Sequence, residues 1–450
     1  MDAAPNDPLA ALRSNAYLKL LLLAGIIGVP ISALAYGFLE LVAQLQEAVF
    51  TDIPKDVLGF ATTPAWWPLP VLALCGLLVA AAISYLPGIG GHSPADGFKA
   101  GGVTAPIELP GILFAALATL SFGAVLGPEA PLILMGSGLG ALAVRLAAKD
   151  SPPTATAVIA AAGSFAAISA LLGSPLLGAF LLLEAAGLGG AQVTIVLMPG
   201  LLSAGIGTLV FVGLDDLTGF GTQSLAIPDL PPFAHPTLAM FGWAIAFGLA
   251  AAVLGKLIRS TALRVRPHVE RRMLVAMPAL GLLIGGLAVV FEQSTDKGYD
   301  QVLFSGQNAL GPLVTQPATW STGALLLLIL CKGVAYSLSL SAFRGGPVFP
   351  SMFIGAAIGV AAADLPGLEL VPAVAMGIGA VATVMLRLPL TAVLLATLLL
   401  LSDGLQAMPL VIVAVAVALV ATVRLDGPPQ KDEPAEPAPT ETPAAAPAAA

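Results

Sequence analysis

Glu129 is a carboxylate in an unusual position: it follows Gly127 and Pro128, and long apolar runs flank it on both sides. A carboxylate near the centre of a lipid bilayer costs about 2.5–3.5 kcal/mol on insertion scales, so its presence there indicates a function. Glycine lets the backbone turn, and proline at a first helical position starts a helix without losing a needed donor. The segment therefore predicts a helix that begins within the apolar layer, with Glu129 in its first turn.

A second segment of the same type occurs in the other half of the chain. Gly127–Ala143 (GPEAPLILMGSGLGALA) aligns with Gly346–Ala362 (GPVFPSMFIGAAIGVAA), so that Gly136 falls on Gly355. Further along, Gly163 can be aligned with Gly377 and Pro175 with Pro389. The matched prolines predict two repeats within one membrane domain, and the binding site of such proteins commonly lies where broken helices of the two repeats meet.

Two helix starts that face each other would form an anion site, because their free N–H groups and positive dipole ends both attract negative charge. The Glu129 carboxylate would occupy the same field and act as a tethered competitor. Protonation of Glu129, or its displacement by an incoming anion, would then open the path. Two alternatives stay open at this point: the Gly-Pro pairs are simple kinks, or Glu129 is a cap that never leaves.

Composition places these segments in a membrane. Hydrophobic residues make up 58% of the 450 residues and charged residues only 10%, which is too few charges to cover a water-soluble domain. Apolar runs recur from Leu20 to Val423; some are too short to cross the bilayer alone, and others are long enough for two helices. Cys75 and Cys331 lie in apolar runs and are interpreted as core residues rather than a disulfide. The fold class predicted is all-α: a polytopic integral membrane protein.

The expected organisation has three parts. Residues 1–16 form a polar N-terminal segment on the cytoplasmic side, residues 17–426 the transport domain with repeats at about 60–215 and 236–424, and residues 427–450 a disordered tail rich in Pro and Ala. No cleavable signal peptide is expected. Six of the eighteen Lys and Arg residues lie between 256 and 272, which predicts a cytoplasmic loop.

Five segments, in the correct order, resemble those of the CLC family of chloride channels and chloride/proton antiporters. They are LPGIGGHSPADG, GAVLGPEAPLILMGSGLG, GSPLLGAFLLLE, SAFRGGPVFPSMFIGAAIG and RLPLTAVLL. The likeness covers about Leu20 to Val423. It implies a homodimer with one pore per subunit, each subunit an antiparallel (inverted-topology) pair of repeats.

The resemblance also implies the site residues. Glu129 matches the gating glutamate, and the anion-binding residues are Gly127, Ala130, Gly346, Val348 and Phe349, through backbone amides, and Ser93. Pro128 and Pro347 stand where the family usually offers an N–H, so each half has one donor fewer. Alignment on Pro94 places Gly91 at the family's pore serine. Two alternatives stay open: Ser93 reaches the anion instead, or backbone amides alone bind it. The inner-gate tyrosine of the family is missing after Val423.

Chloride passage through a passive channel is favoured over proton-coupled exchange. The antiporters of this family usually carry a second acid in the helix that here begins near Pro175, and the matching position is Ala185. Glu184 precedes it and faces about 100° away. It is interpreted as a structural contact at a helix or subunit interface, with a proton relay as the alternative. For Arg344 we expect a role in steering anions. Lys332 and Arg387 either add positive potential near the inner mouth or are structural cations with satisfied contacts.

The residue patterns that an intramembrane enzyme would need are absent from this sequence. An intramembrane enzyme would need a nucleophile with a base, paired carboxylates or an H-E-x-x-H helix, and His92, His235 and His268 are all expected in loops. No enzyme activity, cofactor, metal site or nucleic-acid partner is expected. The expected partners are chloride or another small anion, protons in the antiporter alternative, a second copy of the chain and the lipid bilayer. The expected location is the cell (inner) membrane.

Overall fold

The computed structural model describes residues 12–100, 102–147, 151–187, 189–219, 226–228 and 230–427. Residues 1–11 and 428–450 lie outside this description, and with them most of the expected N-terminal segment and tail. The described residues form fifteen α-helices, α2 to α16, and the all-α polytopic fold predicted from composition is confirmed.

The first half of the chain contains seven α-helices. They are α2 (Asn15–Glu47), α3 (Pro68–Tyr85), α4 (Leu109–Ser121), α5 (Glu129–Ala147), α6 (Pro153–Leu171), α7 (Pro175–Ala186) and α8 (Ala191–Thr218). The second half contains α9 (Leu238–Glu270), α10 (Met273–Ser294), α11 (Gln307–Thr315), α12 (Thr322–Ala342), α13 (Val348–Ala362), α14 (Leu370–Leu386), α15 (Pro389–Leu399) and α16 (Leu401–Asp426). Within the described residues, nine helical segments are long and apolar enough to cross a membrane, and five apolar helices are shorter.

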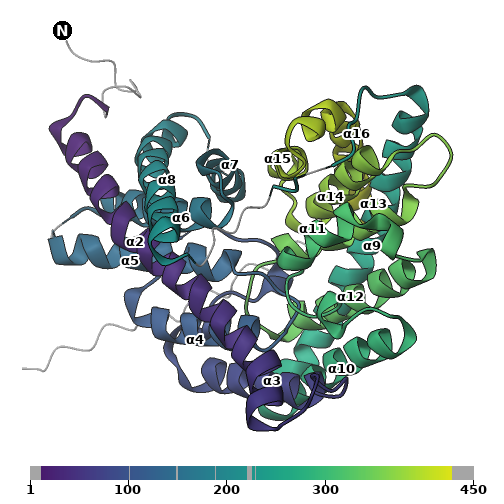
Figure 1. Cartoon of the computed structure of the whole chain (residues 1–450). Helices are drawn as coiled ribbons and strands as arrows, with labels where there is room; N and C mark the ends of the chain where they lie inside the picture. The colour runs from purple at the N-terminus through teal and green to yellow at the C-terminus, as the bar shows by residue number, and fades with distance from the viewer. Residues whose placement is uncertain are drawn as a thin grey trace, which may run out of the picture.

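The two halves lie side by side and repeat the same arrangement of neighbours. In Figure 1, α2 to α8 (purple to teal) occupy one side and most of α9 to α16 (green to yellow) the other, with α3 beside α10 where they meet. Helix α2 packs against α6 and α8, as α9 packs against α14 and α16. We therefore infer that the first repeat begins at α2, earlier than the expected residue 60.

Glycines bring the helices of each repeat into close contact. A Cβ on Gly136 of α5 would collide with the carbonyl of Gly163 of α6, and the reverse also holds. Gly355 of α13 and Gly377 of α14 make the same reciprocal contact. Small residues at such crossings let helix backbones approach in lipid. These are the glycines that align between the halves of the sequence, so the repeat has a packing basis.

The basic segment between 256 and 272 was wrongly expected to be a loop. Helix α9 continues to Glu270, and only a short turn separates it from Met273, where α10 begins. His268 therefore lies in a helix as well. The apolar stretch before Lys256 and the basic stretch after it belong to one helix of 33 residues. A helix of this length is longer than the hydrocarbon layer is thick, so its basic end can extend beyond the membrane.

Candidate functional site

Two helix breaks meet at the centre of the fold. The first runs from the end of α4 at Ser121 to the start of α5 at Glu129, and the second from the end of α12 at Ala342 to the start of α13 at Val348. They are joined by an antiparallel bridge, in which Gly127 N–H donates to the carbonyl of Gly346 (2.8 Å) and Gly346 N–H donates back to Gly127 (2.6 Å). The two helix starts, distant in sequence, are thus adjacent in space.

Each break is also held by a hydroxyl from the helix that precedes the other break. The backbone N–H of Val125 donates to Ser339 Oγ of α12 at 3.0 Å. The N–H of Arg344 donates to Thr119 Oγ1 of α4 at 3.2 Å. Val125 and Arg344 occupy equivalent places in the two halves, so the support is reciprocal. Turns buried in an apolar layer need such partners, because an unpaired backbone N–H is costly there.

Glu129 lies at the junction of these breaks. Its side chain is fully buried, and its Oε1 accepts a hydrogen bond from the backbone N–H of Phe349 at 2.9 Å. Its Oε2 is buried and has no hydrogen-bond partner in the described residues. The first turn of one half therefore inserts a carboxylate into the N-terminus of the broken helix of the other half, where amide donors and the helix dipole favour negative charge.

Only some of the predicted amide donors are available in this arrangement. The N–H groups of Gly127 and Gly346 donate to each other, so their expected role as anion ligands stays a prediction that requires the bridge to open. The N–H groups of Ala130 and Val348 lie in the first turns of α5 and α13, where a helix supplies no acceptor. The N–H of Phe349 is occupied by Glu129.

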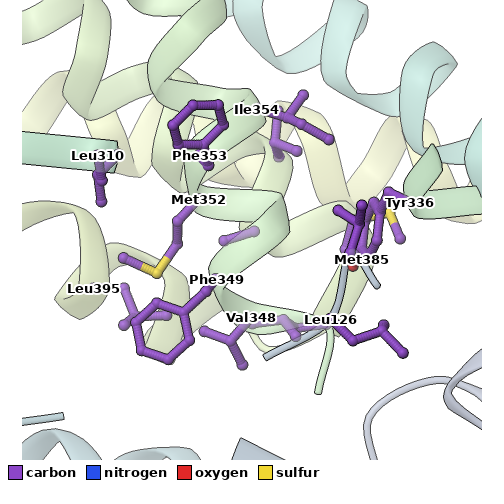
Figure 2. Close-up of a cluster of buried hydrophobic side chains, with 14 of the residues drawn as sticks. Leu126, Leu310, Tyr336, Val348, Phe349, Met352, Phe353, Ile354, Met385 and Leu395 are labelled. Carbon is purple, nitrogen blue, oxygen red and sulfur yellow. The ribbon is translucent and has the colours of Figure 1, made fainter. Parts of the chain in front are cut away.

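Figure 2 shows the start of α13 with its apolar side chains. Val348, Phe349, Met352 and Phe353 project from its first turns, and all four are buried. Tyr336 of α12 donates its hydroxyl to the carbonyl of Pro347 at 2.8 Å, directly before the helix start. The apolar packing fixes the position of the amides at the start of α13.

Two cavities reach the junction. The larger cavity, of about 500 Å³, includes Leu126 and Pro128 of the first break in its wall. The smaller cavity, of about 20 Å³, is lined by Ala130 and Pro131 of α5, by Gly345 and Pro347 of the second break, and by Ser93. Glu129 directly follows Pro128, which lines the larger cavity, and directly precedes Ala130, which lines the smaller one. The hydroxyl of Ser93 is buried without a hydrogen-bond partner in the described part of the chain.

A sequence model of the family described as voltage gated chloride channel matches residues 96–422, which include both breaks and Glu129. The chain belongs to this family, the CLC proteins. It is 26% identical over 351 residues to the putative ion-transport protein YfeO of Escherichia coli O9:H4 (strain HS), which covers 77% of this chain and 80% of YfeO. YfeO of Escherichia coli (strain K12 / DH10B) is similar to the same extent.

Two solved structures share the fold of this CLC protein. A slow cyanobacterial Cl⁻/H⁺ antiporter matches with a TM-score of 0.72 at 20% sequence identity and covers 91% of this chain and 95% of its own. A CLC-type fluoride/proton antiporter matches with a TM-score of 0.65 at 20% identity and covers 90% and 95%. At these identities the likeness concerns the fold alone.

Arg344 brings positive charge to the smaller cavity of this CLC protein. Its guanidinium lies in the cavity wall and donates to the carbonyls of Ile89, Ala342 and Phe343 at 3.2–3.3 Å. The expected steering role of Arg344 stays a prediction.

Glu184 lies apart from the junction and caps a helix. Its Oε1 accepts from Leu390 N–H at 2.9 Å, and its Oε2 accepts from Thr391 N–H at 2.8 Å and from the Thr391 hydroxyl at 2.6 Å. It thereby joins α7 of the first half to the start of α15 of the second. Its contacts match the structural interpretation, and a proton relay through it remains an untested alternative.

Glu184→Ala is expected to lower the stability of the CLC protein by about 1–2 kcal/mol, because the first turn of α15 loses its cap. Thermal unfolding of the purified protein in detergent would show the loss. Glu40→Gln, on α2, is the matched control for removing a carboxylate from a membrane helix. A decrease of stability with unchanged pH dependence of transport is the expected pattern. Loss of pH dependence would instead support the relay.

Three polar residues that support this region were not singled out from the sequence. Thr119, Ser339 and Tyr336 hold the breaks but carry no motif, and isolated hydroxyls in apolar helices were the only available signal. Lys332 contacts the carbonyls of residues 301–304 through its Nζ, and Gln301 and Phe304 of this turn line the larger cavity. Its expected effect near the inner mouth stays a prediction.

Proposed function

We propose that this CLC protein passes chloride, or a similar small anion, across the membrane through a path gated by Glu129. The observation that carries the proposal is the bond between Glu129 Oε1 and Phe349 N–H, fully buried at the junction of two broken helices. A carboxylate held there occupies the position that favours an anion, between two cavities. Displacing or protonating it would connect the cavities through the amides of Ala130, Val348 and Phe349.

Passive conduction is the mode we favour. Proton exchange would need a second acid that passes protons to Glu129. Glu184 is engaged by three donors of α15, and Ala185 follows it. Asp96, near the smaller cavity, is paired with Arg266. Neither acid is free to load and release protons without breaking its contacts.

Proton-coupled antiport is the second candidate. Two observations favour it. The two solved structures named above are described as proton antiporters, one for chloride and one for fluoride. The Gly127–Gly346 bridge also joins the two helix breaks, which suits a mechanism in which the path is closed at rest. The two modes differ in a measurable quantity, the number of protons moved per anion.

Liposomes containing the purified protein, loaded with potassium chloride, test the function and the mode together. Chloride efflux should begin when valinomycin clamps the potential, and gluconate-loaded liposomes should show no comparable anion efflux. Passive conduction predicts no proton movement against its gradient, whereas antiport predicts proton uptake driven by chloride. An inert protein would release no chloride above the rate of empty liposomes.

Ser93→Ala is expected to raise the apparent KM for chloride about three- to tenfold, because the buried hydroxyl then offers no donor to an anion in the smaller cavity. Chloride efflux over a range of concentrations measures it. Ser337→Ala, whose hydroxyl bonds within its own helix to the carbonyl of Gly333, is the matched control. An unchanged KM for Ser93→Ala would remove Ser93 from the anion path.

We also propose that the protein is a homodimer in the inner membrane, with the basic end of α9 in the cytoplasm. Cationic residues next to apolar spans favour the cytoplasmic side. The smaller cavity is then the inner one, since Arg266 of α9 pairs with Asp96 beside it. Light scattering of the detergent-purified protein would give twice the mass of one chain plus detergent; a monomeric mass would contradict the dimer.

A further inference from the structure

Lys332 is a buried cation that the gating mechanism does not use. It lies on α12 with no exposed surface. Its Nζ lies within hydrogen-bond distance of four successive backbone carbonyls, those of Gln301 (3.0 Å), Val302 (3.1 Å), Leu303 (3.0 Å) and Phe304 (3.3 Å), to which its three N–H groups can donate. It also lies 4.5 Å from the centre of the Phe353 ring on α13. Four carbonyls that converge on one point carry negative partial charges and together attract a cation.

The turn that supplies these carbonyls is part of the wall of the larger cavity. Asp300, Gln301, Phe304 and Ser305 all line that cavity, while their neighbours Val302 and Leu303 are fully buried. Phe304 has a φ of +58°, in the left-handed region that non-glycine residues rarely adopt. Its N–H donates to the carbonyl of Gly123 in the first break at 3.1 Å. Lys332 thus lies directly behind the cavity wall, and that wall is connected to the gate region.

Without Lys332, the charged groups around the larger cavity would attract cations rather than anions. The charged residues in its wall are Glu47 and Asp300, both acidic. An uncompensated cluster of carbonyl oxygens would add further negative potential and would suit a monovalent cation. The ammonium group of Lys332 occupies the centre of that cluster and cancels it.

We propose that Lys332 is a positioning and selectivity residue: it fixes the 301–304 turn and offsets the negative potential of its carbonyls, so that the larger cavity becomes less favourable for cations and more favourable for anions. The inference rests on the proposed anion transport and assigns the residue that sets its charge selectivity. Lys332 does not touch the anion; it acts through the wall.

Lys332→Met tests the proposal, because methionine has a similar length and no charge. We expect the apparent KM for chloride to rise about 5- to 20-fold, and a potassium leak, measured with a potassium-sensitive dye, to appear in the same liposomes. A merely structural loss would reduce the number of active molecules and so lower Vmax at unchanged KM. Lys332→Arg keeps the charge and should keep the KM of the wild type. Lys297→Met, which removes a lysine stacked on Trp320, is the matched control.

Asp300→Asn is a second test, which can be made even if Lys332→Met does not fold. Asp300 is exposed on the cavity wall, so its substitution leaves the buried core unchanged. Removing this acid should lower the KM for chloride two- to fivefold at low ionic strength, with the effect disappearing in high salt. Folded Lys332→Met with wild-type KM and no potassium leak would overturn the proposal. If that variant does not fold, an unchanged KM in Asp300→Asn would overturn it. Failure of the wild type to pass any anion would instead refute the proposed function.

Discussion

Glu129→Gln is expected to give an anion flux that no longer depends on pH and that at pH 7.5 at least equals the flux of the wild type at pH 4.5. In the wild type the ionised carboxylate competes with the anion for the N–H of Phe349. Each pH unit changes the ratio of protonated to ionised carboxylate tenfold, so wild-type flux should rise as pH falls. Glutamine mimics the protonated form at every pH and loses the attraction of a full charge to the helix N-terminus.

The measurement is chloride efflux from liposomes at pH 4.5 to 7.5, with protons recorded in parallel. Glu129→Ala should also be independent of pH, since it removes the competitor entirely. Glu40→Gln should keep the wild-type profile. If the wild type exchanges protons, Glu129→Gln should abolish that exchange while chloride still passes. A Glu129→Gln profile that follows the wild type would show that another group is the gate.

Gly346→Ala is expected to lower the anion flux about tenfold or more, whereas Glu129→Gln is expected to raise it at neutral pH. The φ of Gly346 is not positive, so alanine can adopt the same backbone. Its Cβ, however, would coincide with Oε2 of Glu129 and lie 3.1 Å from the N–H nitrogen of Ala130. The methyl group would therefore fill the space that the carboxylate, or the anion replacing it, requires. A buried amide denied its anion loses about 1–3 kcal/mol of favourable interaction.

A double variant separates this explanation from simple displacement of the gate. If the methyl group only pushed Glu129 aside, Gly346→Ala would conduct more, like Glu129→Ala. If it blocks the site, Gly346→Ala combined with Glu129→Ala should remain slow. Gly333→Ala on α12 is the control, because an added Cβ there meets nothing within 4 Å. Equal thermal stability of the single variants would assign the loss to the path rather than to folding.

The position of Glu129 could be predicted from the sequence because its signals are local. Glycine and proline break a helix at the place where they stand, and an acid beside them in an apolar run is unusual by itself. The repeat was visible for a related reason: close helix crossings admit only small residues, so Gly136 and Gly163 recur as Gly355 and Gly377.

The roles of other residues could not be predicted, because their partners come from distant parts of the chain. Nothing near Gly127 in sequence indicates that its N–H is taken by Gly346. Glu184 was placed correctly on its helix, but its three donors belong to α15. The basic end of α9 was misassigned because charge density favours a loop, although a helix can extend beyond the membrane.

The sequence by itself determined the membrane fold, the two repeats and the presence of an acid at a broken helix, since apolar length, glycine spacing and proline act within a few turns. The tertiary structure alone decided which amides remain free for an anion, that the Glu129 carboxylate binds Phe349 of the other half, and that Lys332 contacts the carbonyls of a turn in a cavity wall. These depend on hydrogen bonds between segments 28 to 220 residues apart, whose geometry is set only when the two halves pack together.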